Sequence, residues 1–356
     1  MKKIESFVRA IIHRARTYRY HRDHKTSAKQ ILKAVESQKG KTNPKLIKLS
    51  HDYANDVFGW SGYAPWLCVY SAMAEIFKEG WIPDNYYGWI VAPSINGDYG
   101  ETSTLKAVAN KLFEKSIFPD IAYYVNGLWI SNNGEVLNEN DLKGILFEKS
   151  KTVVYKADNS LQGRGIIVLE KASFDTKDIK SLGNGVFQEY IFQHPFFEEM
   201  MPSSVATLRV TTVLENSGNA SARACYLRIG RKTDTHVRSA SHIRVPVNPK
   251  SGAFGAGGYT VSWLPIDRHP DSNIAFADKQ IPVFDKCLAT ALELHTCFPF
   301  VQCIGWDMII DRNDNVRVME WNGGHNDIKF SEATQGPCFS DLGWEKLWRK
   351  NANAGK

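Results

Sequence analysis

The sequence lacks the features that mark several large classes of protein. It has no run of about 18 apolar residues, which argues against a membrane-spanning helix. Its first apolar stretch is interrupted by Arg9, Arg14 and Arg16 and has no small-residue cleavage site, so we expect no secretory signal. Repeats and low-complexity linkers are also missing. The 356 residues are 43% hydrophobic, enough for a large core shared between two or three lobes.

Cysteine is scarce and forms no pattern. The six cysteines include no Cys-x-x-Cys pair and no Cys/His cluster with zinc spacing. Several stand in apolar stretches, so we expect buried, reduced thiols in a cytoplasmic protein.

Acidic residues are few at the N-terminal end. Residues 1–50 carry 14 Lys and Arg against 3 Asp and Glu, so the net charge of +6 belongs to this end of the chain. Apolar residues recur there at helical spacing between the basic ones. Two interpretations stay open: a helix that caps the domain with a solvated basic face, or one that docks on an anionic membrane surface or on a membrane-bound partner. We do not expect nucleic-acid binding, because the charge is confined to one end and lacks a recognisable module.

The pattern of apolar residues predicts a mixed architecture. Residues 27–81 indicate further helices, with an aromatic-rich buried helix over 60–81, and residues 87–92 indicate a short strand. Helices are also expected over 104–115 and 281–295. Strand patterns cover residues 121–125, 129–130, 153–156, 165–169, 186–191, 204–214, 222–229 and 305–310. Mixed strands and helices with hairpin turns predict an α+β fold.

One strand delivers a lysine to a glycine-containing loop. Lys156 is followed by Gly163 and Gly165, where the backbone can approach a polyanion, and then by a second strand. No Gly-Lys-Ser/Thr follows, so this is not a Walker A loop. An ordinary β-hairpin with a glycine turn is the alternative. A later apolar strand ends in Gln188 and Glu189 and either offers its backbone groups to a purine edge or simply ends at a turn.

A predicted hairpin carries three oxygen-bearing side chains. Glu320 and Asn322 are two residues apart, so they share a face, and Asp307 on the partner strand can share it too. Oxygen groups among apolar neighbours suit a hard cation such as Mg²⁺. The alternative is a set of polar residues on a solvated face.

An arginine interrupts another apolar strand. Arg209 lies among β-branched residues, where a guanidinium needs an anionic partner such as phosphate or carboxylate. Residues 233–258 are rich in Ser, His, Arg and Gly, which is typical of a mobile lid or of a plain surface insertion.

In this order, the segments resemble the ATP-grasp superfamily over roughly residues 85–325. Within it the chain resembles the sugar-transfer-associated proteins of bacterial surface-polysaccharide clusters, on GWIPDNYY at 80–87, QEYIFQHP at 188–195 and IGWD at 304–307. The resemblance implies an ATP-grasp fold, two α+β lobes that grip ATP, with an N-terminal helical extension. The implied domains are a helical region over 1–84 and an ATP-grasp domain over 85–345, divided into lobes at about 85–150, 151–195 and 196–345.

The resemblance also implies site residues. Contacts to ATP are expected from Lys106, Lys156, Gln162, Gly163, Arg164, Gly165, Gln188, Glu189, Tyr190, Ile191, Gln193 and His194. Gln193 or His194 would reach the ribose. Mg²⁺ would be held by Asp307, Glu320 and Asn322, while Arg209 and Arg228 would face the transferred phosphate as catalytic residues. Many family members place an arginine two residues before the metal-binding aspartate; here that position is Gly305.

The implied function is an ATP- and Mg²⁺-dependent ligase that forms an amide through an acylphosphate. It would join an amino acid or amine to a carboxyl-bearing sugar or glycan in capsule or O-antigen biosynthesis, in the cytoplasm or at the inner face of the membrane. Two alternatives stay open: a kinase acting on a sugar hydroxyl, and a non-catalytic nucleotide-binding partner of a glycosyltransferase.

Overall fold

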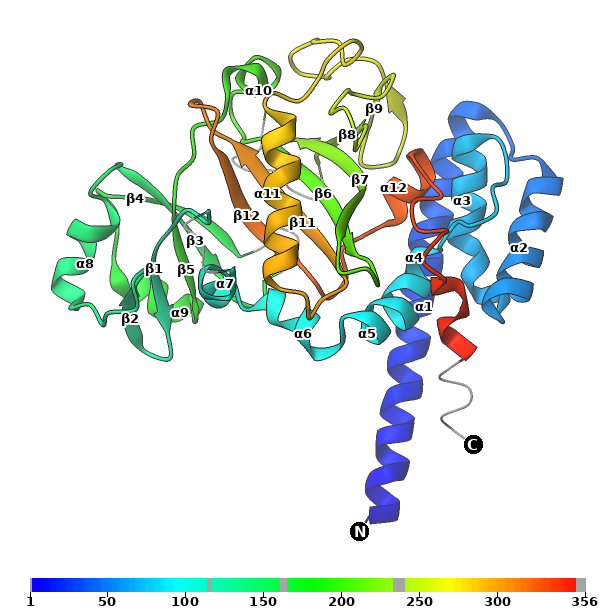
Figure 1. Cartoon of the computed structure of the whole chain (residues 1–356), viewed down its shortest axis with the longest axis horizontal. Helices are drawn as coiled ribbons and strands as arrows, with labels where there is room; N and C mark the ends of the chain where they lie inside the picture. Colours follow the sequence, from blue (N-terminus) through cyan, green and yellow to red (C-terminus); the bar gives the residue numbers. More distant parts are fainter. Residues whose placement is uncertain (1, 114–116, 161–164, 233–240, 350–356) are drawn as a thin grey trace. The chain divides into compact units, whose positions relative to one another are not determined.

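The computed structural model describes residues 2–113, 117–160, 165–232 and 241–349. The chain packs as two units (Figure 1). A helical unit contains Met1–Ser94, Ser262–Leu264 and Asp327–Lys356, and a sheet unit contains Ile95–Val261 and Pro265–Asn326. The lobe boundaries that the resemblance implies stay predictions.

The helical unit begins with the chain's longest helix. Its elements are α1 (Lys2–Lys39), α2 (Pro44–Phe58), η1 (Ser61–Tyr63), α3 (Ala64–Ala74), α4 (Asp84–Tyr86), η2 (Tyr87–Val91), α5 (Ala92–Ile95), α12 (Lys329–Thr334) and η5 (Trp344–Lys346). Helix α2 shows why such segments form: the Asn43 side chain accepts the Lys45 N–H, Pro44 opens the helix, and Gly59 ends it in the left-handed conformation. Among the described residues, no helix combines the length and apolar composition that a membrane span requires.

Two expectations for this unit are wrong. Residues 87–92 form a π-helical turn and the start of α5, not a strand. Tyr86, Tyr87 and Val91 are all buried, so the apolar spacing in this segment is helical. The buried helix expected over 60–81 ends at Ala74, because Glu75 takes a left-handed conformation.

The sheet unit contains a five-stranded antiparallel sheet of order β2-β1-β5-β3-β4. Its strands are β1 (Asp120–Val125), β2 (Leu128–Ser131), β3 (Thr152–Ala157), β4 (Ile166–Glu170) and β5 (Gly185–Glu189). One face packs on α8 (Glu139–Leu146) and α9 (Thr176–Leu182) through a core that includes Tyr155 and Phe187. The opposite face carries Lys156 and Gln188, whose side chains point away from that core because strand residues alternate.

The second sheet is antiparallel and has seven strands in the order β10-β9-β8-β7-β6-β11-β12. The strands are β6 (Thr207–Leu214), β7 (Ala220–Ile229), β8 (Ile243–Val247), β9 (Gly258–Tyr259), β10 (Pro265–Ile266), β11 (Cys303–Ile310) and β12 (Val316–Asn322). One face packs on α11 (Phe284–Cys297), which crosses the sheet in Figure 1. Strand β8 lies inside the segment 233–258, so its interpretation as a loop or insertion is wrong for residues 243–247.

Short elements connect the sheets within this unit. They are α6 (Gly97–Glu101), η3 (Thr102–Thr104), η4 (Lys106–Val108), α7 (Ala109–Phe113) and α10 (Pro195–Met200). The helix expected over 104–115 is therefore broken: the described part begins as 3-10 turns and becomes α-helical only at Ala109. All six cysteines are free, and four of them are buried.

A chain of buried hydrogen bonds fixes α11 against the second sheet. His295 donates from Nε2 to the Val301 carbonyl at 2.8 Å, so its Nδ1 accepts from the Thr212 hydroxyl at 2.6 Å. That hydroxyl in turn accepts the Trp306 indole N–H at 2.8 Å. Burial lowers the pKa of His295 to about 4, which keeps the ring neutral and the donor pattern consistent.

We expect Thr212→Val to lower the free energy of unfolding by about 2–4 kcal/mol, because it leaves a buried indole N–H and a buried imidazole nitrogen without partners. Urea unfolding measures this loss. Thr211→Val, the same change one residue earlier on the opposite face of β6, is the control. Equal stability of the two variants would contradict the structural role of the hydrogen-bond chain.

Candidate functional site

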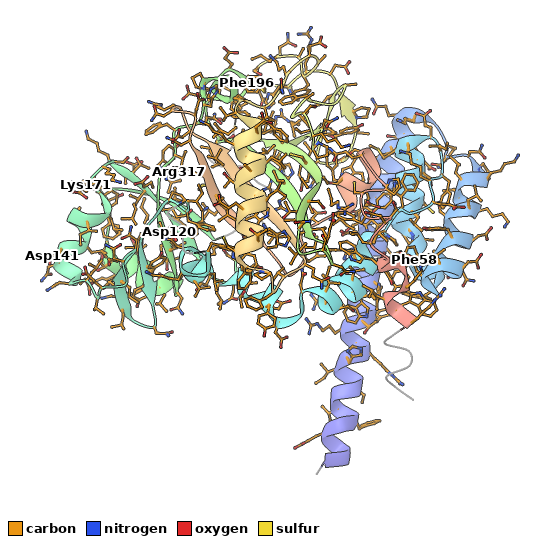
Figure 2. All side chains as sticks on the ribbon, in the orientation of Figure 1. Phe58, Asp120, Asp141, Lys171, Phe196 and Arg317 are labelled. Atoms are coloured by element: carbon orange, nitrogen blue, oxygen red, sulfur yellow. The ribbon has the colours of Figure 1, made fainter. Side chains whose placement is uncertain are left out.

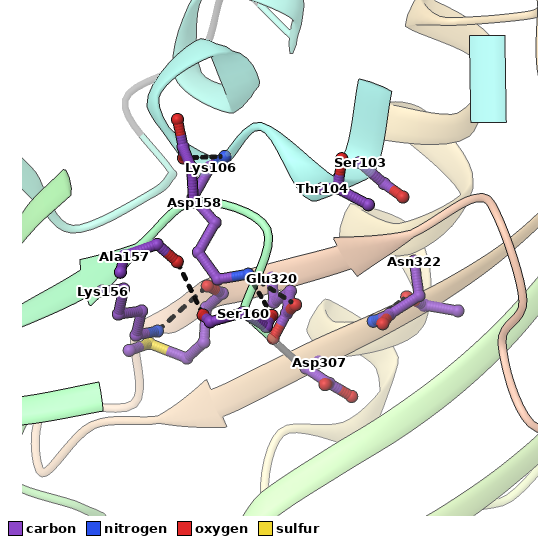
Figure 3. A network of polar contacts seen from close by, with 12 residues as sticks. Ser103, Thr104, Lys106, Lys156, Ala157, Asp158, Ser160, Asp307, Glu320 and Asn322 are labelled. Atoms are coloured by element: carbon purple, nitrogen blue, oxygen red, sulfur yellow. Dashed lines mark hydrogen bonds and ion pairs between the residues drawn. The ribbon is translucent and has the colours of Figure 1, made fainter. Parts of the chain in front are cut away.

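A β-bulge in the β11–β12 hairpin decides which side chains face the site. Asp307 pairs with Glu320 and Met308 pairs with Val318, so Met319 is an extra residue on β12. The bulge turns Glu320 and Asn322 onto the face that carries Asp307, and returns Trp321 to the core. The three predicted metal-binding side chains therefore share one face of the sheet (Figure 3).

Two lysines reach this face from the other parts of the unit. Lys106, in η4, lies 3.2 Å from the Glu320 carboxylate and 3.2 Å from the Ser160 carbonyl. Lys156, at the end of β3, donates to the Met319 carbonyl at 3.1 Å (Figure 3). Because the bulge removes Met319 from regular pairing, its carbonyl can accept this bond.

Burial is the main influence on Lys156. It lowers the pKa of this lysine to about 8; the Lys106 charge lowers it further, and the Glu320 carboxylate opposes the shift. A buried, protonated amine forms a strong ion pair with a phosphate group, because little water screens the two charges.

Asp307 is held between two arginines. Arg209 approaches it with Nε at 2.5 Å and with Nη2 at 3.0 Å, and Arg228 contacts it from the next strand. Burial alone would raise the pKa of Asp307, but the two guanidinium charges hold the pKa well below its usual range. Arg209 also donates to the Asn326 carbonyl at 2.8 Å, which fixes its planar fork.

Gly305 makes room for Arg209. A Cβ atom at position 305 would lie 3.1 Å from Arg209 Nη1 and 2.9 Å from Asn326 Cβ, closer than packing allows. The space beside Gly305 is thus filled by a guanidinium from the neighbouring strand β6.

The balance of charge at this face is positive. Its cations are Lys106, Lys156, Arg209 and Arg228, and its two facing carboxylates are Asp307 and Glu320. A bare Mg²⁺ ion would be repelled by the excess of positive charge, whereas a magnesium–nucleotide complex brings its own phosphate charges. Among the described residues, no three His, Cys, Asp or Glu side chains gather as a metal site. The residues therefore fit Mg²⁺ only together with nucleotide phosphates and the Asn322 amide oxygen, since the Asn322 amide nitrogen donates to the Gly305 carbonyl.

The expected adenine residues lie at the end of β5. Gln188 is buried and donates to Asp120 at 2.8 Å, and its amide oxygen has no partner among the described residues. The Glu189 side chain pairs with Lys149 at 2.8 Å. Tyr190 and Ile191 follow the strand, which ends two residues earlier than expected.

A cavity adjoins this strand end. Its volume is about 320 Å³, and its lining residues are Thr152, Val168, Glu170, Tyr190, Phe192 and Ser203. It lies beside β3, β4 and the end of β5, and its lining combines aromatic and aliphatic side chains with hydroxyl and carboxylate groups.

Gln193 and His194, the two residues expected to reach the ribose, form hydrogen bonds within the protein. The Gln193 amide donates to the Met201 carbonyl at 2.7 Å and accepts the Ala206 N–H at 2.8 Å. His194 caps α10 through Nδ1, and its Nε2 lies 3.1 Å from Asp314. Both side chains stabilise local structure here, and their ribose contacts stay predictions.

The loop after Lys156 is described only in part. Gln162, Gly163 and Arg164 lie outside the described residues. Gly165 packs closely, since a Cβ there would lie 2.4 Å from Ser160 Cβ. It ends the turn that returns the chain to β4.

Sequence reasoning missed three residues of the site. Asp158 accepts the Lys106 backbone N–H at 2.7 Å and so anchors η4 beside the lysine loop. Asp120, at the start of β1 (Figure 2), is buried beside Gln188, and burial raises its pKa to about 6. Met319 contributes its carbonyl. Of these three residues, only Asp158 could have been found from the sequence, because it stands two residues after Lys156.

The fold and the arrangement of the site identify the class of protein. The two antiparallel sheets, with lysines and a carboxylate hairpin facing one another, define the α+β ATP-grasp fold with an N-terminal helical region. The profile of sugar-transfer associated ATP-grasp proteins matches residues 94–339, so the chain belongs to that family. A search among curated proteins finds no match.

Solved structures give distant similarities. Biotin carboxylase from Campylobacter jejuni in complex with β,γ-ATP is 13% identical with a TM-score of 0.43, covering 69% of this chain and 46% of that one. N5-carboxyaminoimidazole ribonucleotide synthetase from Thermotoga maritima is 13% identical with a TM-score of 0.37, covering 64% and 44%. The ATP-grasp ligase PsnB, complexed with minimal precursor, is 12% identical with a TM-score of 0.39, covering 72% and 63%. The chain thus spans less than two thirds of each of these structures.

The lowered pKa of Lys156 predicts a pH dependence of nucleotide binding. Phosphate binding needs the protonated amine, so affinity is full below pH 7 and falls as the pH rises through about 8, by up to about tenfold per pH unit. Titration of the protein with Mg²⁺ and a non-hydrolysable ATP analogue from pH 7 to pH 9.5 measures this loss of affinity.

Two variants serve as the test and its control. Lys156→Met should bind the nucleotide weakly and without this pH dependence, while Lys171→Met, at an exposed lysine after β4, should behave as wild type. The same pH profile in Lys156→Met as in wild type would refute the assignment.

Proposed function

We propose that the chain is an ATP- and Mg²⁺-dependent carboxylate–amine ligase. The observation that carries this proposal is the cluster of four cations around Asp307 and Glu320 on one face of an ATP-grasp sheet. Such a cluster suits a triphosphate whose terminal group gains charge during transfer. The family's association with sugar transfer supports an acceptor that is a carboxyl-bearing sugar or glycan, in capsule or O-antigen biosynthesis.

Each residue of the cluster has a definable task. Lys106 and Lys156 would bind the phosphates, and Arg209 and Arg228 would face the phosphoryl group that moves. Asp307, Glu320 and Asn322 would hold the Mg²⁺ ion that, once bound with the nucleotide, neutralises phosphate oxygens. The unpartnered amide oxygen of Gln188 is a buried acceptor for the adenine amino group.

The reaction has two balanced steps. A carboxylate oxygen attacks the γ-phosphorus, the bond to the bridging oxygen breaks, and ADP leaves with the electron pair. An amine then attacks the acyl carbon, loses a proton and displaces phosphate, which forms the amide. The acylphosphate must be kept from water between these steps, which two sheets closing over the nucleotide would achieve.

We expect Glu320→Gln to lower ADP release by at least about 100-fold while the thermal unfolding temperature changes little, because Glu320 is only part-buried. Asp307→Asn should also abolish turnover, with a stability loss, since it leaves two buried guanidiniums unpaired.

The assay measures ADP release with amino acids and uronic acids as substrates. Glu215→Gln, which breaks the Arg223 pair elsewhere in the unit, is the matched control. Full activity in Glu320→Gln would refute the metal assignment, and ADP release without an amine would favour the kinase.

We propose a second contact, between α1 and an anionic lipid surface. Phe7 and Ile12 are 66% and 60% exposed, and with Val8 and Ile11 they occupy one side of the helix. Basic residues are numerous in the same helix, which gives charge complementarity to anionic lipid. The exposed apolar side chains and the basic charge together distinguish this surface from a merely solvated helix.

Substitution of Phe7, Ile11 and Ile12 by Ser should abolish sedimentation with vesicles that contain anionic lipid, and wild-type binding should weaken at high salt. Leu49→Ser, at an exposed leucine of α2, is the control and should bind as wild type. Unchanged sedimentation of the triple variant, or dimerisation of the wild type through this helix, would contradict the proposal.

A further inference from the structure

Lys106 stands on a short segment with little apolar packing of its own. Turn η4 contains only Lys106–Val108 and follows the turn η3, with no longer helix before it to fix its direction. None of residues 104–108 is buried, and Leu105 and Val108 are 40% and 36% exposed. Because so little apolar surface is buried there, the position of the Lys106 backbone depends on polar contacts.

Asp158 supplies the central polar contact. It directly follows β3, the strand that carries Lys156, so the pairing of β3 in its sheet fixes its position. Its Oδ1 accepts the Lys106 backbone N–H at 2.7 Å and lies 3.4 Å from the Ala107 nitrogen (Figure 3). The first N–H groups of a helical turn have no acceptor within that turn. Asp158 therefore joins the backbone of Lys106 to the strand of Lys156.

Two further hydrogen bonds join the same two segments. The Asn159 N–H donates to the Thr104 carbonyl at 2.9 Å, and the Lys106 ammonium donates to the Ser160 carbonyl at 3.2 Å. Backbone carbonyls accept both of these bonds. Asp158 is thus the acceptor between the segments that a side-chain substitution can remove.

The spacing of the two lysines matters for a polyphosphate. Lys156 donates to the Met319 carbonyl and Lys106 contacts Glu320, so their ammonium groups lie against consecutive residues of β12. A lysine that must be ordered during binding contributes less affinity than one already held in place. A residue that fixes Lys106 relative to Lys156 therefore strengthens nucleotide binding without contacting the nucleotide.

We propose that Asp158 is a positioning residue, which holds Lys106 at a fixed spacing from Lys156 so that both lysines bind the phosphates of one nucleotide. Its carboxylate acts through the backbone of Lys106. The inference rests on the proposed function, because these lysines bind phosphate groups only if the chain binds ATP.

The sign of the charge separates positioning from simple electrostatics. The ionised Asp158 carboxylate is a negative charge beside Lys106, so its charge alone opposes the binding of phosphate. Removal of the carboxylate would then strengthen nucleotide binding if charge were its only effect. Positioning predicts the opposite, because the Lys106 backbone loses its acceptor.

The test is a double-mutant cycle on nucleotide binding by the full chain. Isothermal titration calorimetry with Mg²⁺ and a non-hydrolysable ATP analogue measures the dissociation constant. Asp158→Ala should weaken binding at least about tenfold in the wild-type background and less than about twofold in the Lys106→Met background. A disturbance of Lys156 would instead persist when Lys106 is absent.

Two further variants control for charge and for stability. Asp158→Asn keeps an oxygen that accepts the Lys106 N–H, so it should bind the nucleotide at least as tightly as the wild type. Asp175→Ala is the matched control, because the Asp175 side chain likewise accepts a backbone N–H, that of Lys177 at 2.9 Å, at the start of α9. It should lower the thermal unfolding temperature, as the loss of a cap does, and leave nucleotide affinity unchanged.

The outcomes separate this inference from the proposed function. If the nucleotide does not bind the wild type, the proposed function fails and this inference fails with it. If the nucleotide binds, three results would show that the positioning role is wrong while the proposed function stands: Asp158→Ala binds as tightly as the wild type, it loses the same factor with and without Lys106, or Asp158→Asn loses as much affinity as Asp158→Ala.

Discussion

The site depends on one buried carboxylate held between guanidinium groups from two adjacent strands. Asp307 is buried in the sheet, where an unpaired charge would cost several kcal/mol, and it is stable as an anion because Arg209 and Arg228 contact it. The register of β11 on β6 places Asp307 directly opposite Arg209. A slip of one residue between β11 and β6 would put Asp307 and Arg209 on opposite faces of the sheet and separate the two charges, so the ion pair and the register support each other.

The contacts within the site use the same two lysines that a bound phosphate would contact. Glu320 holds Lys106, and the Met319 carbonyl holds Lys156, so the lysine loop and the hairpin are already joined. These bonds are modest in energy because each replaces contacts with water. A polyanion offers the same lysines stronger partners, and the exchange would order the site without a large change in its framework.

Much of the fold and part of the site could be predicted from the sequence, for physical reasons. Alternation of apolar residues gave the strands of the β11–β12 hairpin and put Glu320 and Asn322 on one face. It could not give the bulge at Met319, because a single extra residue changes the face of everything after it without changing composition. Nor could it assign Gln193, whose structural bonds depend on carbonyls that local pattern does not place. The partner of Arg209 is 98 residues away, and the sequence indicated only that an anion was needed.

Gly305 on β11 leaves the space in which the guanidinium beside Asp307 lies. A glycine on β11 leaves a gap on the site face, and the Arg209 side chain from β6 fills it. The guanidinium beside Asp307 therefore belongs to β6, and Arg228 on β7 contacts the same carboxylate from one strand further along the sheet. A side chain at position 305 would displace the Arg209 fork and weaken this ion pair, so the glycine and the two guanidiniums depend on one another.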